Sequence, residues 1–432
     1  MEANAFNRRN FLRTLSGAAG LLLATPVVNS LAQAAPVGGI PTISKMIKVG
    51  LVGCGGRGLG AIKDALDADP NVVVWSLGDV FPERIGFSID LLTKQFGPRV
   101  QVDKSRQFVG LDSYQGVIGT DIDVVLLCTP PAFRPEQLSA AVAANKHIYA
   151  EKPMAVDVPG ILSVMETAKV AKDKNIIILD GFCWRYDPAN VEAHQKLRNG
   201  DLGKVLGFDG VYFTSPPKSP LALDSRPAGE SDVSWALRNW TAWYWLSGGQ
   251  LVEQIVHTID GMVWSMGDRM PIAASGTGGR AQRTDDGDVW DHYDIRFEYD
   301  HEALGHISCR QWVGCHGQIE DKTYCEKGLL VTPNRPKIES VERWRFRGER
   351  GNMYANTHVQ FYQFLKDNKY VQTLDEAAQK TLVAIMGREA AHTGQRITWD
   401  QILKNNRRLV PEKLTMETSL PPARIPRPGR FA

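Results

Sequence analysis

The chain has 432 residues, with 50 lysines and arginines against 48 aspartates and glutamates and a formal net charge of +2. A chain this close to neutral has no electrostatic footprint for a nucleic acid, so nucleic-acid partners are excluded on charge. The length suggests two domains, each large enough to bury its own core.

An export signal is predicted at the amino terminus. A twin-arginine pair at residues 8–9 precedes a mildly apolar stretch over 15–28 and an A-x-A cleavage site at 32–34. The apolar stretch has 14 residues, interrupted by two glycines and a proline, whereas a membrane-spanning helix needs about 20. We therefore expect cleavage of residues 1–34, a linker over 35–45, a periplasmic protein and no stable membrane insertion of the mature chain. An uncleaved amino-terminal anchor is the alternative.

A glycine-rich turn follows the first predicted strand, over residues 47–52. The turn matches G-x-G-x-x-G and precedes a predicted helix over 59–68, which is the context in which this pattern binds a dinucleotide. Gly53 allows the tight turn, Gly55 lets the backbone approach a pyrophosphate, and Gly58 lets the helix pack closely on the strand. The helix amino terminus offers free N–H groups to the anion. A glycine turn without a ligand is the alternative.

An acidic residue ends the second predicted strand, over residues 72–77. Asp79 lies 21 residues after Gly58, where a carboxylate accepts hydrogen bonds from a ribose 2′-hydroxyl. We expect NAD as the cofactor, because this carboxylate would repel the 2′-phosphate of NADP. NADP is still possible if Arg57 or Arg84 neutralises the acid.

Strands and helices alternate through the rest of the first half, which predicts an α/β domain over residues 46–181 with a doubly wound parallel Rossmann sheet. Ligands on such a sheet bind at the carboxyl ends of the strands. Thr129 and Pro130 follow one strand, and Glu151 and Lys152 follow the next. We expect these four residues to reach the cofactor. The further predicted strands cover 123–128, 147–150 and 176–179, and the helices cover 82–96, 135–145 and 157–174.

The second predicted domain, over residues 182–432, has a different pattern. Alternation of apolar and polar residues, as at 293–299, indicates a largely antiparallel open sheet with one covered face, in an α+β domain that binds substrate and forms oligomers. Thr373 and Glu376 fit a capping box for a helix that stops at Gly394. The other predictions are a helix over 188–198, a strand over 205–213, an irregular loop over 215–232 of the kind that serves binding sites, and apolar helices over 234–246 and 250–266.

The cysteines favour neither disulfides nor a metal site. The six are scattered and do not form a disulfide framework. Cys309, Cys315 and Cys325, with His306 and His316 nearby, could bind zinc, but no C-x-x-C pair is present. We expect ordinary strand residues and no metal.

Lys152, Glu253 and His257 are the candidate catalytic residues. Glu253 and His257 are four residues apart on a predicted helix and so share one face, where the carboxylate could orient the imidazole as a general base. Lys152 could donate hydrogen bonds to a developing alkoxide. The alternatives are a core histidine and a solvated lysine. Arg185 and Tyr244 are candidate substrate contacts, and Trp235, Trp240, Trp243 and Trp245 could stack on a sugar or pack in the core.

Taken in order, these motifs resemble the glucose-fructose oxidoreductase, inositol dehydrogenase and rhizopine-catabolism family, Gfo/Idh/MocA. The resemblance implies that Lys152 lies beside the nicotinamide and the substrate hydroxyl, with Glu253 and His257 completing the site. This chain has Glu253 where the family's D-x-x-x-H pattern has aspartate, and Phe133-Arg134 where many members have a histidine. The motifs are residues 53–58, Asp79, Thr129-Pro130, 146–153, 199–204, 248–257 and 387–390.

An exported enzyme of this kind needs a cofactor that travels with it. The periplasm maintains no NAD pool, and the twin-arginine route carries folded proteins, so we expect a tightly bound cofactor that is recycled in place. A second substrate could reoxidise it, as in a sugar or polyol oxidoreductase, or one substrate could be oxidised, cleaved and reduced again, as in an NAD-dependent glycosidase. Lys152 favours the oxidoreductase, and a non-catalytic dinucleotide-binding sensor is the third hypothesis. The open sheet face predicts a homo-oligomer.

Overall fold

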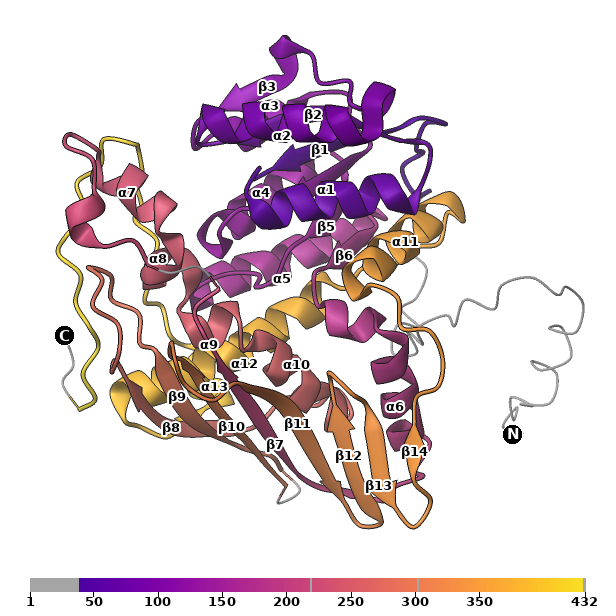
Figure 1. Ribbon diagram of the computed structural model, residues 1–432, viewed down its shortest axis with the longest axis vertical. Helices are drawn as coiled ribbons and strands as arrows, with labels where there is room; N and C mark the ends of the chain where they lie inside the picture. Colours follow the sequence, from indigo (N-terminus) through magenta and orange to yellow (C-terminus); the bar gives the residue numbers. More distant parts are fainter. Residues whose placement is uncertain (1–38, 218–219, 301–302, 430–432) are drawn as a thin grey trace, which may run out of the picture.

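The computed structural model describes residues 39–217, 220–300 and 303–429, so the predicted export signal over residues 1–34 lies outside the described residues. Two sheets form the framework (Figure 1). The first is the predicted six-stranded parallel Rossmann sheet, in the order β3-β2-β1-β4-β5-β6. Its strands are β1 (Ile47–Val52), β2 (Val72–Asp79), β3 (Gln107–Val109), β4 (Val124–Leu127), β5 (His147–Ala150) and β6 (Ile178–Asp180).

Helices cover the Rossmann sheet, and one of them comes from the second half of the chain. α11 (Met353–Lys366) packs against α1, and its Phe361 and Leu365 share a buried cluster with Ile62. α11 therefore belongs to the core of the first domain. The boundary predicted near residue 181 would place it in the second domain. The helices between the strands are α1 (Gly56–Ala68), α2 (Pro82–Phe96), α3 (Ser113–Gly119), α4 (Arg134–Ala143) and α5 (Val158–Asp173).

The second sheet has nine strands in the order β14-β13-β12-β11-β7-β10-β9-β8-β15. All its pairings are antiparallel except that of β7 with β10, which confirms a largely antiparallel sheet. Its strands are β7 (Val205–Thr214), β8 (Ala273–Gly279), β9 (His292–Glu298), β10 (Leu304–Gln311), β11 (Gln318–Cys325), β12 (Gly328–Thr332), β13 (Lys337–Ser340), β14 (Trp344–Arg345) and β15 (Ile397–Thr398).

Two helices lie between this sheet and the first domain, α10 (Val256–Ser265) against β7 and β11 and α12 (Leu374–Thr393) against β8 and α5 (Figure 1). Along β9 and β10 buried side chains alternate with more exposed ones, as expected for a sheet with one covered face. The remaining helices are α6 (Pro188–Arg198), α7 (Asp232–Arg238), α8 (Tyr244–Ser247), α9 (Gln250–Glu253) and α13 (Trp399–Leu403).

Two predictions for this domain are wrong in detail. The two long apolar helices are short segments, because Asn239 ends α7 inside the first and the second is interrupted between α9, which ends at Glu253, and α10, which begins at Val256. The capping box is not formed, since the Thr373 hydroxyl accepts a hydrogen bond from the Asp180 N–H and makes no capping bond to α12. The end of α12 at Gly394 is confirmed.

Candidate active site

The glycine turn between β1 and α1 forms a cradle that side chains would fill. A Cβ on Gly58 would lie 1.8 Å from the Gly53 carbonyl oxygen, and one on Gly53, whose φ is 94°, would lie 2.8 Å from the Cys128 carbonyl carbon. Gly55 instead faces open space, with the Arg84 guanidinium the nearest group at 3.8 Å. The first N–H groups of α1 have no partner within the helix. The turn therefore fits a pyrophosphate that approaches the backbone at Gly55.

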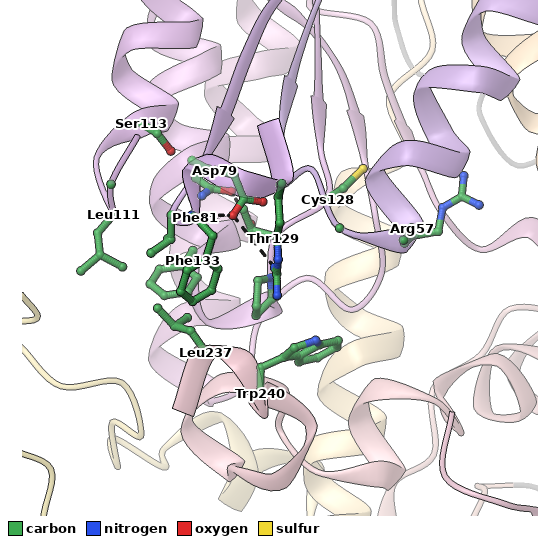
Figure 2. Close-up of a pocket in the computed structure, with 18 residues that line it drawn as sticks. Arg57, Asp79, Phe81, Leu111, Ser113, Cys128, Thr129, Phe133, Leu237 and Trp240 are labelled. Carbon is green, nitrogen blue, oxygen red and sulfur yellow. Dashed lines mark hydrogen bonds and ion pairs between the residues drawn. The ribbon is translucent and has the colours of Figure 1, made fainter. Parts of the chain in front are cut away.

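Asp79 lies at the carboxyl end of β2, in the pocket above this turn (Figure 2). Its carboxylate accepts hydrogen bonds from the Cys54 N–H at 2.7 Å and the Phe81 N–H at 2.9 Å. Desolvation raises the pKa of this carboxyl, although both hydrogen bonds and Arg84 oppose the shift. Arg84 is the nearest cation, at 4.0 Å. Asp79 is thus fixed in direction and available to a ribose hydroxyl.

Arg57 and Glu151, both predicted to bind the cofactor, form an ion pair. Arg57 Nε lies 2.9 Å from Glu151 Oε1, and its Nη2 lies 3.1 Å from Asp64 Oδ2. The guanidinium also stacks over the Tyr354 ring, 4.7 Å from its centroid. Through these contacts Arg57 joins α1 to the end of β5 and to α11, while it also lines the cofactor pocket.

Arg134 is a structural clamp that sequence reasoning missed. Its buried guanidinium donates to the carbonyl oxygens of Leu127, Thr129 and Pro153, at 2.6, 2.7 and 3.2 Å. Burial lowers its pKa to about 10. It therefore ties the end of β4 to the E-K-P loop, at a position where many family members have a histidine. Thr129 donates to Gln137 Oε1 at 2.6 Å, and it lines the pocket together with Pro130.

Lys152 meets Glu253 across the two domains. The Lys152 ammonium donates to the Glu253 carbonyl oxygen at 2.6 Å and lies 3.3 Å from the Glu253 carboxylate. The Lys152 and Glu253 side chains are only 13% and 18% exposed, so solvent screens the pair weakly. This contact directs the E-K-P lysine toward the helices of the second domain.

The predicted Glu253–His257 pair is wrong in geometry. α9 ends at Glu253 and α10 begins at Val256, and between them the Ile255 N–H bonds five residues back, to Gln250. This break turns the Glu253 carboxylate to Lys152. Within the described part of the chain, His257 Nδ1 is buried with no hydrogen-bond partner. Burial, and then the charge of Lys152, hold the pKa of His257 well below its usual value, so the ring is neutral.

Aromatic rings, rather than a carboxylate, hold His257. Trp184 stacks on it with centroids 5.2 Å apart, and Phe182 contacts it edge-on at 6.0 Å. Trp184 is half-buried and also stacks with Tyr212, at 6.4 Å and an interplanar angle of 10°. Sequence reasoning missed Trp184, although it follows Asp180, the last residue of β6, and strand ends are where such sheets bind ligands.

The two predicted substrate contacts have structural roles. Arg185 forms a partly buried ion cluster with Asp260, on the helix that carries His257, at 2.8 Å and with Asp268 at 2.9 Å. The Tyr244 hydroxyl contacts that of Tyr293 at 2.6 Å and the His392 ring at 2.9 Å. Neither side chain is free to contact substrate in this arrangement.

Two models of one family match the chain. The oxidoreductase family with an NAD-binding Rossmann fold matches residues 47–178, and the GFO/IDH/MocA C-terminal domain matches residues 190–331. Together they span more than half of the chain. The chain belongs to the Gfo/Idh/MocA family. NAD is its cofactor, and the glycine cradle and Asp79 fit that dinucleotide.

Proteins similar to this chain are named for different activities. A glycosyl hydrolase family 109 protein of Shewanella pealeana is 26% identical over 51% of this chain and 49% of its own length, and a myo-inositol 2-dehydrogenase of Thermotoga maritima is 22% identical over 73% and 84%. The chain spans about half the length of the first curated relatives it matches. A structure of levoglucosan dehydrogenase in complex with NADH and levoglucosan has the same fold. The match covers 82% of this chain and 99% of the levoglucosan dehydrogenase chain, with a TM-score of 0.63 and 20% sequence identity.

The described residues contain no cluster of three or more histidine, cysteine or acidic side chains that could hold a metal ion. None of the helices described is both long enough and apolar enough to span a bilayer. This Gfo/Idh/MocA protein thus has a dinucleotide cradle on its first domain, and the Lys152 ammonium and the neutral His257 ring lie near each other outside that cradle.

Proposed function

We propose that the protein is an NAD-dependent oxidoreductase that acts on a CH–OH group of a sugar, glycoside or polyol. The observation that carries the proposal is the placement of the Lys152 ammonium and the neutral His257 ring at the junction of the two domains, beside the strand ends that hold the dinucleotide. The myo-inositol and levoglucosan dehydrogenases, which are similar to this chain, are named for polyol and sugar substrates.

In this proposal the glycine turn and Asp79 would hold NAD, which would supply the acceptor for a hydride from the carbinol carbon. His257 accepts the hydroxyl proton, because its neutral ring lies near Lys152 and its Nδ1 has no hydrogen-bond partner among the described residues. Lys152 donates a hydrogen bond to the same oxygen as negative charge develops there. Glu253 positions Lys152 through its carbonyl and carboxylate. Trp184 stacks with His257 and with Tyr212 and so holds the His257 ring in position.

We also propose that NAD is preferred over NADP, because Asp79 would repel a 2′-phosphate. Arg84, 4.0 Å from Asp79, could weaken this preference by offsetting the charge of the carboxylate. Calorimetry on protein stripped of nucleotide should give tighter binding of NAD, and equal or tighter binding of NADP would refute the preference.

The predicted twin-arginine signal supports a periplasmic location and a tightly held cofactor that is recycled between two half-reactions.

The open face of the second sheet supports a homo-oligomer, and light scattering of the purified protein tests the oligomeric state. On this face His306 bridges Asp209 at 2.8 Å and Asp294 at 3.1 Å.

The second candidate is an NAD-dependent glycosidase that oxidises its substrate, cleaves it by elimination and reduces it again. Similarity to the glycosyl hydrolase family 109 proteins supports it. The two candidates differ in net redox change. Only the oxidoreductase leaves an oxidised sugar, and only the glycosidase releases an aglycone.

The deciding experiment begins with mass spectrometry of the small molecules released from the denatured protein. A panel of sugars, polyols and glycosides is then added to the protein as isolated, and the nicotinamide absorbance and the products are followed. Bound dinucleotide and an oxidised sugar would support the proposal, whereas aglycone release without net reduction would establish the glycosidase. Full occupancy with no response to any substrate would favour a dinucleotide-binding sensor.

A further inference from the structure

The pocket beside Asp79 has a second wall, contributed by the other domain. Leu237, near the end of α7, and Trp240, which begins a short 3-10 helix over Trp240–Ala242, face the loops after β2 and β3 across the pocket (Figure 2). Lys152 and His257 do not line this pocket. It therefore covers the pyrophosphate and adenosine part of the cofactor site, since the glycine turn lines it and an acid at the end of the second strand meets the adenosine ribose.

Arg238 fixes this wall to the Rossmann domain without lining the pocket. Its Nη1 lies 3.0 Å from Glu83 Oε1, at the start of α2, and its guanidinium lies 4.0 Å from the centroid of the Phe81 ring. Its Nε lies 2.9 Å from Glu230 Oε1, in the segment that precedes α7. One side chain thus joins α7 to the loop that carries Asp79.

The carboxyl-terminal arm, residues 404–429, supports the wall from outside. It runs along α7 and α8 in Figure 1, and its apolar residues, among them Leu414 and Leu420, pack on the cluster that contains Leu237. The Leu409 N–H donates to Asp157 in the Rossmann domain at 2.7 Å, and the Leu420 N–H donates to Asp232 of α7 at 3.0 Å. The arm therefore contacts both domains and packs behind the wall.

We propose that Leu237 and Trp240 contact the adenine of bound NAD and that Arg238 is the positioning residue that holds them there. The half-buried indole of Trp240 offers a flat apolar face, which matches the face of a purine ring. The wall must move before the adenosine can leave, so it slows cofactor release. This inference rests on NAD binding and is independent of the substrate.

The test is the rate at which NADH leaves the full-length protein, followed by its fluorescence after mixing with excess NAD. Trp240→Ala should accelerate release about tenfold, and Trp240→Phe, which keeps a ring, about threefold. Arg238→Gln should accelerate it about threefold, as expected for loss of a partly exposed ion pair and a cation–π contact. The matched control is Arg396→Gln, which removes an ion pair with Glu298 at the edge of the second sheet and should leave the rate unchanged.

ADP-ribose, which has the adenosine but lacks the nicotinamide, locates the contact. Trp240→Ala should weaken ADP-ribose and NADH by the same factor. NADH release within about twofold of wild type in both Trp240 variants and in Arg238→Gln would overturn the proposal. Weakened NADH with unchanged ADP-ribose would overturn it as well, because the wall would then contact the nicotinamide end. Neither result depends on turnover, so the proposed oxidoreductase activity is tested separately.

Discussion

Two glycine turns position the chemistry of this protein, and they use glycine in opposite ways. In the turn after β1, Gly55 leaves open space into which a ligand can come. In the turn between α8 and α9, the space is already filled by protein, since a Cβ on Gly249 would lie 2.3 Å from the Tyr244 ring. The first turn therefore serves binding directly. The second turn allows close packing of the backbone against the Tyr244 ring. Its contribution to the site is indirect, because the packed turn places Glu253 next to Lys152.

The largest expected effect is on catalysis, where the two domains meet. Lys152→Ala and His257→Ala should each reduce turnover by about a hundredfold or more, because each removes a group that handles the proton or the developing charge. Steady-state kinetics with the best substrate measures the loss, and bound dinucleotide should survive. Lys322→Ala, which removes a lysine paired with Glu320 at 3.0 Å, and His316→Ala, at an exposed histidine, are the matched controls. Near-normal turnover in either site variant would remove that residue from the mechanism.

Alanine at each glycine turn sharpens the comparison. Gly55→Ala should weaken NAD binding by about tenfold or more with little change in stability, because the new methyl occupies the ligand's space and its nearest protein atom, in the Arg84 guanidinium, is at an ordinary contact distance of 3.8 Å. Gly249→Ala should destabilise the fold by about 1–3 kcal/mol, because its φ of 83° disfavours alanine and the Tyr244 ring must move. Calorimetric titration with NAD and urea unfolding measure the two quantities. If both variants lost stability equally, the proposed division between binding and packing would fail.

Glu253→Gln should reduce turnover by about fivefold, less than loss of either catalytic residue, since Lys152 keeps its hydrogen bond to the Glu253 carbonyl oxygen. The conservative variant Glu253→Asp tests position, because it retains the charge but shortens the side chain by one methylene. An unchanged rate in both variants would reduce Glu253 to a packing residue.

The smallest expected effect is on the pH dependence of stability. His257 is neutral in the fold, while an unfolded histidine binds a proton below about pH 6.5, so stability falls as the pH drops through that value. His257→Asn should lessen this fall by at most about 1.4 kcal/mol per pH unit below pH 6.5. Urea unfolding at several pH values measures the slope. His194 and His358, with pKa values lowered by burial to about 4 and about 3, contribute to the slope in both proteins. Identical slopes would contradict a buried neutral His257.

The sequence predicts the Rossmann half well because its signals are local. The glycine spacing, the buried strands and Asp79 each act through backbone geometry that neighbouring residues determine. Tertiary contacts decide the rest. The i, i+4 rule failed at Glu253 because the helix breaks at residues 254–255, and Arg185 is committed to Asp260 and Asp268, which are distant in sequence. The predicted capping box at Thr373 likewise does not form, because the Thr373 hydroxyl accepts a hydrogen bond from the N–H of Asp180, almost two hundred residues earlier in the chain.

The most direct test of the central claim is a single turnover of the protein as isolated, mixed with the best sugar or polyol of the panel and no added nucleotide. If the cofactor is tightly bound and recycled, we expect the absorbance of reduced nicotinamide to rise once, to the level set by the bound dinucleotide. The absorbance should then decay when a keto-sugar or an aldehyde is added. Lys152→Ala with the same cofactor content should show the rise about a hundredfold more slowly. A protein that is isolated empty and needs added NAD for every turnover would contradict the tightly bound, recycled cofactor, and an equal rate in Lys152→Ala would contradict the proposed site.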